Sequence, residues 1–153
     1  MSSVIPYLCI KDAARAVAFY AQVFGAVESP GRITDSAGRI GHTEIRIGDS
    51  KLYVADEHPE HGFRSPQSLG GAHVLFVVSV PDVDAMVSRA VAAGGTLTRP
   101  IEDQFYGDRT AEVTDPFGYR WTLSTHVRDV SAEEMQRGAT ARERQRKTAP
   151  QER

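Results

Sequence analysis

Cysteine and long apolar runs are scarce in this chain. Cys9 is the single cysteine among 153 residues, so no disulfide bond can form within the chain. No window approaches the ~18 consecutive apolar residues that a membrane-spanning helix needs. The first residues also lack the basic and apolar regions of a secretory signal peptide. These absences predict a cytoplasmic protein that does not contact a membrane.

A strong net charge is missing as well. The formal net charge is −2, with 41% apolar and 25% charged residues, which suits an ordinary globular domain and argues against a general nucleic-acid binder. A basic excess is confined to residues 137–153, where no aromatic residue is interleaved to stack on bases. We therefore expect a solvated helix end there and no nucleic-acid partner. The sequence also lacks a glycine-rich phosphate loop, a Gly-x-Ser-x-Gly elbow and zinc-type cysteine spacing.

What the sequence does contain is an internal repeat. Residues 5–30 match residues 75–100 at an offset of 70, with Asp12 opposite Asp82. Both aspartates suit a helix N-cap, because the carboxylate accepts hydrogen bonds from free first-turn N–H groups. A glycine follows each expected helix, where it takes a positive φ at little cost. Each copy therefore begins with a strand and a helix.

The second part of each copy predicts further strands. The expected helices cover residues 13–24 and 83–93, and alternating stretches with turns between them follow each one. These stretches repeat at an offset of 68, so that residues 52–54 fall opposite residues 120–122. The offset places Tyr53 opposite Trp121, both at helix-facing core positions. The chain is therefore predicted to hold two βαβββ-type modules.

The repeat defines a domain organisation. We expect one domain over residues 1–136, with module one at 1–56, a turn-rich linker at 57–71 and module two at 72–128. Residues 131–153 are expected to form a C-terminal helix and a basic tail. Ser131 followed by Glu134 forms a capping box, in which each side chain bonds the free backbone N–H of the other residue.

Paired βαβββ modules resemble the vicinal-oxygen-chelate superfamily, which includes glyoxalase I, bleomycin-resistance proteins and extradiol dioxygenases. Several strings are similar to its PhnB-like branch when they are taken in order and at their spacing. They are Lys-Asp-Ala-Ala-Arg-Ala at 11–16, Phe-Tyr at 19–20, Phe-Gly at 24–25, Ile-Gly-Asp-Ser at 47–50, Asp-Gln-Phe-Tyr-Gly-Asp-Arg at 103–109 and Asp-Pro-Phe-Gly at 115–118. The likeness covers residues 4–136.

The resemblance implies an α+β fold. Two curved mixed sheets would face each other around a cavity, with helices outside and a C-terminal helix in addition. It also implies a homodimer, in which modules of different chains often complete one sheet or pocket. Members fill the cavity with a divalent metal that chelates a substrate, or with a small organic ligand and no metal.

The family's metal ligands, His or Glu, are not found at the positions where the resemblance puts them. The surrounding strings place these positions at Ile5, Val54, Leu75 and Thr122. Three are hydrocarbons and one is a hydroxyl, whereas first-row divalent ions need imidazole, carboxylate or thiolate donors. We therefore expect no cofactor. A slip of the register by two residues would bring His73 into such a position, so a divalent metal at a displaced site stays open.

Strand alternation assigns further polar side chains to the cavity face. His42 and Glu44 project together from one strand. They form a hydrogen-bonded polar pair, a His–carboxylate acid/base pair or, with His73 and Glu112, the displaced metal site. Arg109 is either a donor for an oxyanion or part of a structural ion pair with Asp108 or Glu112. The ligand-binding candidates are Tyr7, Cys9, His42, Glu44, Arg46, His73, Gln104, Tyr106, Asp108, Arg109 and Glu112.

Two functions follow from these alternatives. The first is a homodimeric small-molecule binding protein without a metal, in which Tyr7 and Tyr106 would contact the ligand and Arg109, Arg46 or Glu44 would fix its polar groups. The second is a metal-dependent lyase or isomerase that uses the displaced site, where a bound ion would lower the pKa of a substrate C–H or of a water. The sequence leaves open whether the protein is an enzyme.

Overall fold

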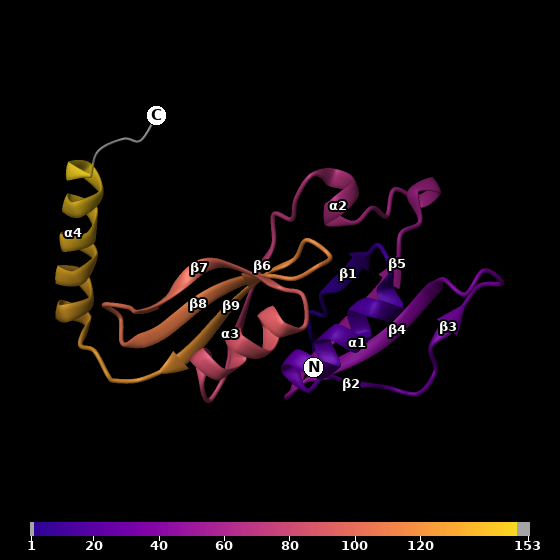
Figure 1. Ribbon diagram of the computed structural model, residues 1–153, viewed down its shortest axis with the longest axis horizontal. Helices are drawn as coiled ribbons and strands as arrows, with labels where there is room; N and C mark the ends of the chain where they lie inside the picture. The colour runs from indigo at the N-terminus through magenta and orange to yellow at the C-terminus, as the bar shows by residue number, and fades with distance from the viewer. Residues whose placement is uncertain (1, 150–153) are drawn as a thin grey trace.

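A computed structural model describes residues 2–149 and contains two mixed sheets and four α-helices (Figure 1). Module one contains β1 (Tyr7–Ile10), α1 (Ala13–Phe24), β2 (Val27–Glu28), β3 (Ile33–Thr34), β4 (Ile40–Ile47) and β5 (Ser50–Asp56). The linker contains a 3₁₀ turn, Pro59–His61, and α2 (Pro66–Leu69). Module two contains β6 (Leu75–Ser79), α3 (Val83–Ala92), β7 (Thr96–Asp103), β8 (Asp108–Thr114) and β9 (Arg120–His126), and α4 (Ala132–Thr148) follows it.

The two sheets have the same topology. The strand order is β1-β5-β4-β2 in module one, where β3 also pairs with β4, and β6-β9-β8-β7 in module two. The first strand of each module runs parallel to the last, and the remaining pairs are antiparallel. The predicted α+β class, with two mixed sheets and a C-terminal helix, is confirmed.

Local sequence signals account for the helix boundaries. Asp12 accepts a hydrogen bond from the Arg15 N–H, and Asp82 accepts one from the Ala85 N–H, as expected of N-caps. Ser131 and Glu134 form the predicted reciprocal capping box at the start of α4. No helix among residues 2–149 is long and apolar enough to cross a membrane.

The helix-facing sides of both sheets belong to one hydrophobic core. Tyr20 of α1 lies 5.2 Å from Trp121 of β9 between ring centroids, and its hydroxyl donates a 2.6 Å hydrogen bond to Asp115 Oδ2. Trp121 Nε1 donates to the same oxygen at 2.9 Å. These contacts pack the helix of module one against module two, so the two modules form a single folded unit.

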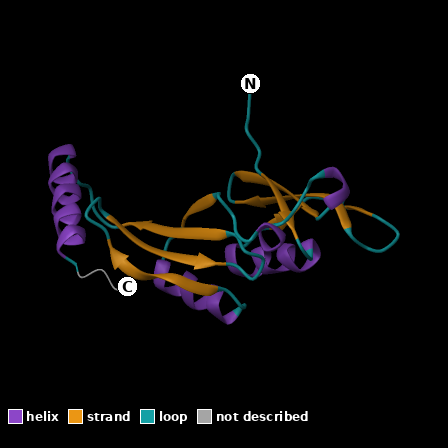
Figure 2. Ribbon diagram, turned by 90° about the horizontal axis from the view of Figure 1, so that it is seen from above, coloured by secondary structure: helices purple, strands orange, loops and turns teal. Residues whose placement is uncertain are grey.

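The packing of the helices determines how the sheets are arranged. The modules lie side by side along the long axis of the molecule (Figure 1), and α1 and α3 lie next to each other below the strands in Figure 2. The two sheets of one chain therefore lie side by side (Figure 1), and residues of both modules, among them Ile5, Ser50 and Val77, line a pocket where they meet. Their other faces are open, and apolar side chains such as Tyr7 (45% exposed), Leu75 (43%) and Val77 (66%) lie at the surface.

The register of β5 corrects one prediction. Tyr53 pairs with Tyr7 and Glu44 and is half-buried on the open face, whereas Val54 is fully buried under α1. In module two the position that pairs with Glu112 is Thr122. Tyr53, and not Val54, is therefore the counterpart of Thr122. Glu44 and its partner Tyr53 are nine positions apart in the sequence, whereas Glu112 and its partner Thr122 are ten positions apart. The repeat offset used for the prediction was therefore wrong by one residue on β5, and a slip of one residue moves every side chain of a strand to the opposite face.

Candidate functional site

Glu112 lies at the centre of the open face of module two. Its carboxylate accepts two 3.0 Å hydrogen bonds from Arg120, one on each oxygen, and the Thr98 hydroxyl donates to Oε1 at 3.1 Å. Arg99 Nε lies 3.5 Å from Oε2. The Arg120 guanidinium holds the pKa of Glu112 below its usual range, despite the burial of the side chain. Glu112 is therefore a fixed, ion-paired carboxylate and not a free base.

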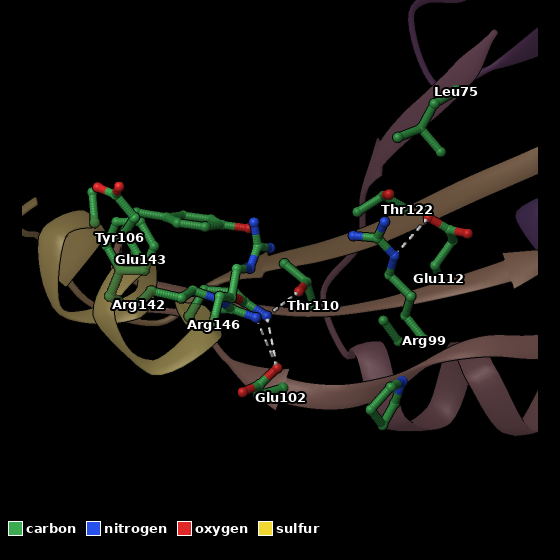
Figure 3. Close-up of a pocket in the computed structure, with 15 residues that line it drawn as sticks. Leu75, Arg99, Glu102, Tyr106, Thr110, Glu112, Thr122, Arg142, Glu143 and Arg146 are labelled. Carbon is green, nitrogen blue, oxygen red and sulfur yellow. Dashed lines mark hydrogen bonds and ion pairs between the residues drawn. The ribbon is translucent and has the colours of Figure 1, made fainter. Parts of the chain in front are cut away.

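A cavity of about 710 Å³ lies over this face. Thr110, Glu112 and Thr122 form part of its floor, and Arg142 and Arg146 extend over it from α4 (Figure 3). Three predicted ligand-binding residues line the cavity, namely Gln104, Tyr106 and Glu112. Leu75 and Thr122, two of the positions that the family uses for its metal, line it too.

Three contacts hold α4 as one wall of this cavity. Gly138 lies so close to Phe105 that a Cβ at this position would be 2.6 Å from Phe105 Cδ2. Arg142 donates a 2.6 Å hydrogen bond to Gln104 Oε1 and lies 3.5 Å from Glu102 Oε2. The expectation of a solvated helix end is therefore incomplete, because α4 also forms a wall of the cavity. The available signal was Gly138, which is unfavourable in a helix interior unless close packing requires it.

The loop at Gly107 fixes the segment that leads into α4. The Gly107 carbonyl accepts hydrogen bonds from the N–H groups of Val127 and Arg128 at 2.9 and 3.1 Å. A Cβ at Gly107 would collide with the Arg128 carbonyl oxygen, and φ is 98°. The glycine of the Tyr-Gly-Asp-Arg string therefore serves a close approach of two backbone segments.

Arg109 points away from the cavity. Its guanidinium pairs with Asp84 of α3 at 2.8 and 3.0 Å and with Asp103 at 2.9 Å, and these carboxylates raise its pKa. Arg109 was predicted to be either a donor for an oxyanion or part of a structural ion pair with Asp108 or Glu112. The structure has a structural ion pair, but its partners are Asp84 and Asp103. Alternation along β8 is the reason, since Arg109 faces the side opposite to Thr110 and Glu112.

Asp108 is also occupied by structural contacts. It accepts a 2.9 Å hydrogen bond from Ser124 and lies 3.0 Å from His126 Nδ1, and the imidazole lowers the pKa of the carboxyl. His126 Nε2 lies 2.9 Å from Asp129, in the segment before α4. Asp108 therefore contributes to the attachment of α4 and not to the lining of the cavity.

The open face of module one is filled by aromatic rings. Tyr7 Oη lies 2.8 Å from His42 Nδ1, and the ring of Tyr7 contacts Tyr53 at 5.6 Å and Phe63 of the linker at 5.3 Å between centroids. Glu44 pairs with Lys51 at 3.1 Å. His42 and Glu44 therefore lie on one face, as alternation predicted, but each has its own partner.

The remaining candidates lie apart from this cluster. Cys9 is buried, and burial together with Glu57 and Asp56 raises the pKa of its thiol to about 12, so the thiolate is not accessible at neutral pH. Arg46 and His73 are exposed.

The residues present do not fit the family's metal. After correction of the register, the four inherited positions carry Ile5, Tyr53, Leu75 and Thr122, which offer no strong donor to a divalent ion. In one chain the displaced set is split between two sheets, and Glu44 and Glu112 are paired with cations. Among residues 2–149 no three His, Cys, Asp or Glu side chains are grouped to hold a metal.

Comparison with known proteins identifies the family. The Glyoxalase/Bleomycin resistance protein/Dioxygenase superfamily matches residues 4–123, and the chain belongs to it. An uncharacterized protein of Mycobacterium bovis is 40% identical over 134 residues, which are 86% of this chain and 88% of that one.

Solved structures show the same fold. An X-ray structure of an Arabidopsis thaliana gene product has a TM-score of 0.68 at 29% identity and covers 81% of this chain and 98% of its own. The crystal structure of TioX from Micromonospora sp. ML1 has a TM-score of 0.62 at 29% identity, with 83% and 100% covered.

Proposed function

We propose that this protein binds a small organic ligand on the open face of module two without the family's metal, and that it belongs to the PhnB-like branch whose strings it carries. The cavity of about 710 Å³ over Glu112 and Thr122 carries the proposal, because its size suits a small organic molecule. The hydrocarbon and hydroxyl groups at the inherited metal positions support binding through the side chains alone. Glu112 and Arg120 would act as a fixed polar pair on the cavity floor.

We further propose that the protein is a homodimer. Members of this superfamily bind small molecules and often form dimers. The apolar side chains of Tyr7 and Val77, which do not line the ligand cavity, remain exposed on the two sheets. Burying such side chains against a second copy removes apolar surface from water, which favours association. Light scattering with size-exclusion chromatography measures the mass directly, and a monomer at micromolar concentration would contradict this part.

Fluorescence titration with N-phenylnaphthylamine, an uncharged aromatic probe, tests the site. We expect saturable binding at one site per chain. Thr122→Tyr introduces the bulk that Tyr53 has in module one and should weaken binding at least about tenfold, a change of about 1.4 kcal/mol. Thr140→Tyr adds the same side chain on the outer surface of α4 and is the matched control. No saturable binding, or equal weakening by both variants, would refute the site.

Metal content tests the second part of the proposal. Protein purified without a histidine tag is incubated with nickel, manganese or zinc, desalted and measured by plasma mass spectrometry. We expect far less than one ion per chain. One ion per chain that is lost in Glu112→Gln or His42→Gln would instead establish a displaced metal site, and lyase and isomerase assays would then be the next step.

A further inference from the structure

Arginines and glutamates line the cavity over module two in equal number. Three glutamates line it, and each has a cationic partner: Glu112 pairs with Arg120, Glu102 with Arg142 and Glu143 with Lys147. Arg120 and Lys147 do not themselves line the cavity, whereas Arg99, Arg142 and Arg146 do. Two of the three glutamates thus have a cationic partner outside the lining, and Glu112 also lies 3.5 Å from Arg99 inside it.

Arg146 is the cation with the fewest contacts. It is exposed, lines the cavity, and has no ion pair or side-chain hydrogen bond with another residue among residues 2–149. Arg142, one turn earlier on the same side of α4, is held by Gln104 and Glu102. Figure 3 shows both arginines extending from α4 over the cavity, on the side where Tyr106 lies. A guanidinium with two polar contacts and one with none among residues 2–149 thus lie next to each other at the cavity.

Apolar groups lie beside these arginines. Phe105 and Tyr106 line the same end of the cavity, and Leu75 and Pro100 line it further along the sheet. A guanidinium provides several N–H donors in a planar array that matches carboxylate, sulfonate and phosphate oxygens. Cations beside an aromatic wall suit a ligand with an apolar body and one anionic group.

We propose that α4 selects an organic anion, with Arg146 and Arg142 binding its acidic group and Phe105 and Tyr106 contacting its apolar body. This inference rests on the proposed ligand site and specifies its ligand class. The family match ends at residue 123, so α4 lies outside the part of the chain that the superfamily shares. The selectivity would therefore come from residues outside the matched segment.

The test compares two probes with the same aromatic body. Anilinonaphthalene sulfonate carries one anionic group, and N-phenylnaphthylamine carries none. We expect the sulfonate to bind the wild-type chain at least about tenfold more tightly, since charge-assisted hydrogen bonds are among the stronger polar contacts. This preference should decrease as the salt concentration rises.

Single substitutions test whether Arg146 causes the preference for the sulfonate probe over the uncharged probe. Arg146→Gln should weaken sulfonate binding about fivefold to tenfold and leave binding of the uncharged probe unchanged. Arg144→Gln removes the same charge from the opposite side of α4 and should leave both probes unchanged. Arg142→Gln, which also loses the contact to Gln104, is measured as a second variant together with circular dichroism, which reports whether α4 remains folded.

The outcomes separate this inference from the proposed function. Equal affinity for the two probes, or equal weakening of sulfonate binding by Arg146→Gln and Arg144→Gln, would overturn the anion selectivity while the ligand site stands. Failure of both probes to bind would overturn the ligand site itself.

Discussion

On the open face of each sheet a glutamate lies beside a cation of the next strand. Glu44 is 3.1 Å from Lys51 in module one, and Glu112 is 3.0 Å from Arg120 in module two. The neighbouring position carries Tyr53 in one module and Thr122 in the other. A tyrosine fills the space above its glutamate with an aromatic ring, whereas a threonine leaves that space open.

The exposures of the two glutamates run in the opposite order, because Arg120, Arg99 and Thr98 contact the carboxylate of Glu112. The side chain of Glu44 is 25% exposed and that of Glu112 is 5% exposed. In module one, Tyr7, Tyr53 and Phe63 pack over the sheet, whereas in module two α4 stands away from the sheet and leaves a cavity. The repeat therefore conserves an acid–cation pair, while a few neighbouring side chains decide which module has a cavity.

The largest effect is expected where the two modules meet. Asp115 is buried and accepts hydrogen bonds from the Tyr20 hydroxyl, the Trp121 indole and the N–H groups of Phe117 and Tyr119. Asp115→Ala leaves these buried donors unpaired and should lower the free energy of unfolding by about 3–5 kcal/mol in urea titrations. Asp49→Ala, in the corresponding exposed turn of module one, should cost less than about 0.5 kcal/mol. Similar losses would contradict this role.

The second effect compares two glycines with positive φ. Gly107→Ala forces a Cβ against the Arg128 carbonyl and should cost about 2–4 kcal/mol, because strain and collision act together. Gly48, with φ of 56°, has open space around it, so Gly48→Ala should cost about 1 kcal/mol. Thermal unfolding gives the order. Gly107→Ala should also weaken N-phenylnaphthylamine binding, and unchanged binding would show that this loop does not position α4.

The third effect concerns the two glutamates themselves. Glu112→Gln replaces a carboxylate that is only 5% exposed and pairs with Arg120, and should cost about 1–3 kcal/mol, since the charged hydrogen bonds of a buried side chain are lost. Glu44→Gln removes a more exposed pair with Lys51 and should cost less than Glu112→Gln, because solvent screens this pair. Chemical unfolding at low and high salt measures both. If Glu44→Gln lost more unfolding free energy than Glu112→Gln, the conclusion that the pair in module two is the more buried and more stabilising one would be wrong.

The smallest effect is a pH dependence in module two. The carboxylates of Asp108 and Asp129 raise the pKa of His126 above its ordinary value of about 6.5. The stabilisation from this contact is complete below the pKa of the unfolded chain and is lost as the pH rises through the raised pKa of the folded chain. An NMR titration of His126 should show the raised pKa in the wild-type chain and a lower value in Asp129→Asn. An unchanged titration would rule out the Asp129 contact in solution.

Strand alternation predicted the faces of some side chains correctly and of others wrongly, as β9 and β5 show. The alternation in module two placed Leu75, Thr122 and Glu112 on one face, where the structure has them. The same reasoning failed for Val54 because the offset of the repeat changes by one residue across the hairpin, and no local signal reveals that change. Arg109 shows the other limit: its partner Asp84 is 25 residues away on α3, outside any local pattern.

By itself, the sequence determined the repeat and the helix caps at Asp12, Asp82 and Ser131. These features depend on local backbone chemistry and on residue identity, which can be read directly along the chain. Only the tertiary structure decided where the cavity lies. Its walls come from β7, β8, β9 and α4, and the contact of Arg142 with Gln104, 38 residues apart, exists only after the chain has folded.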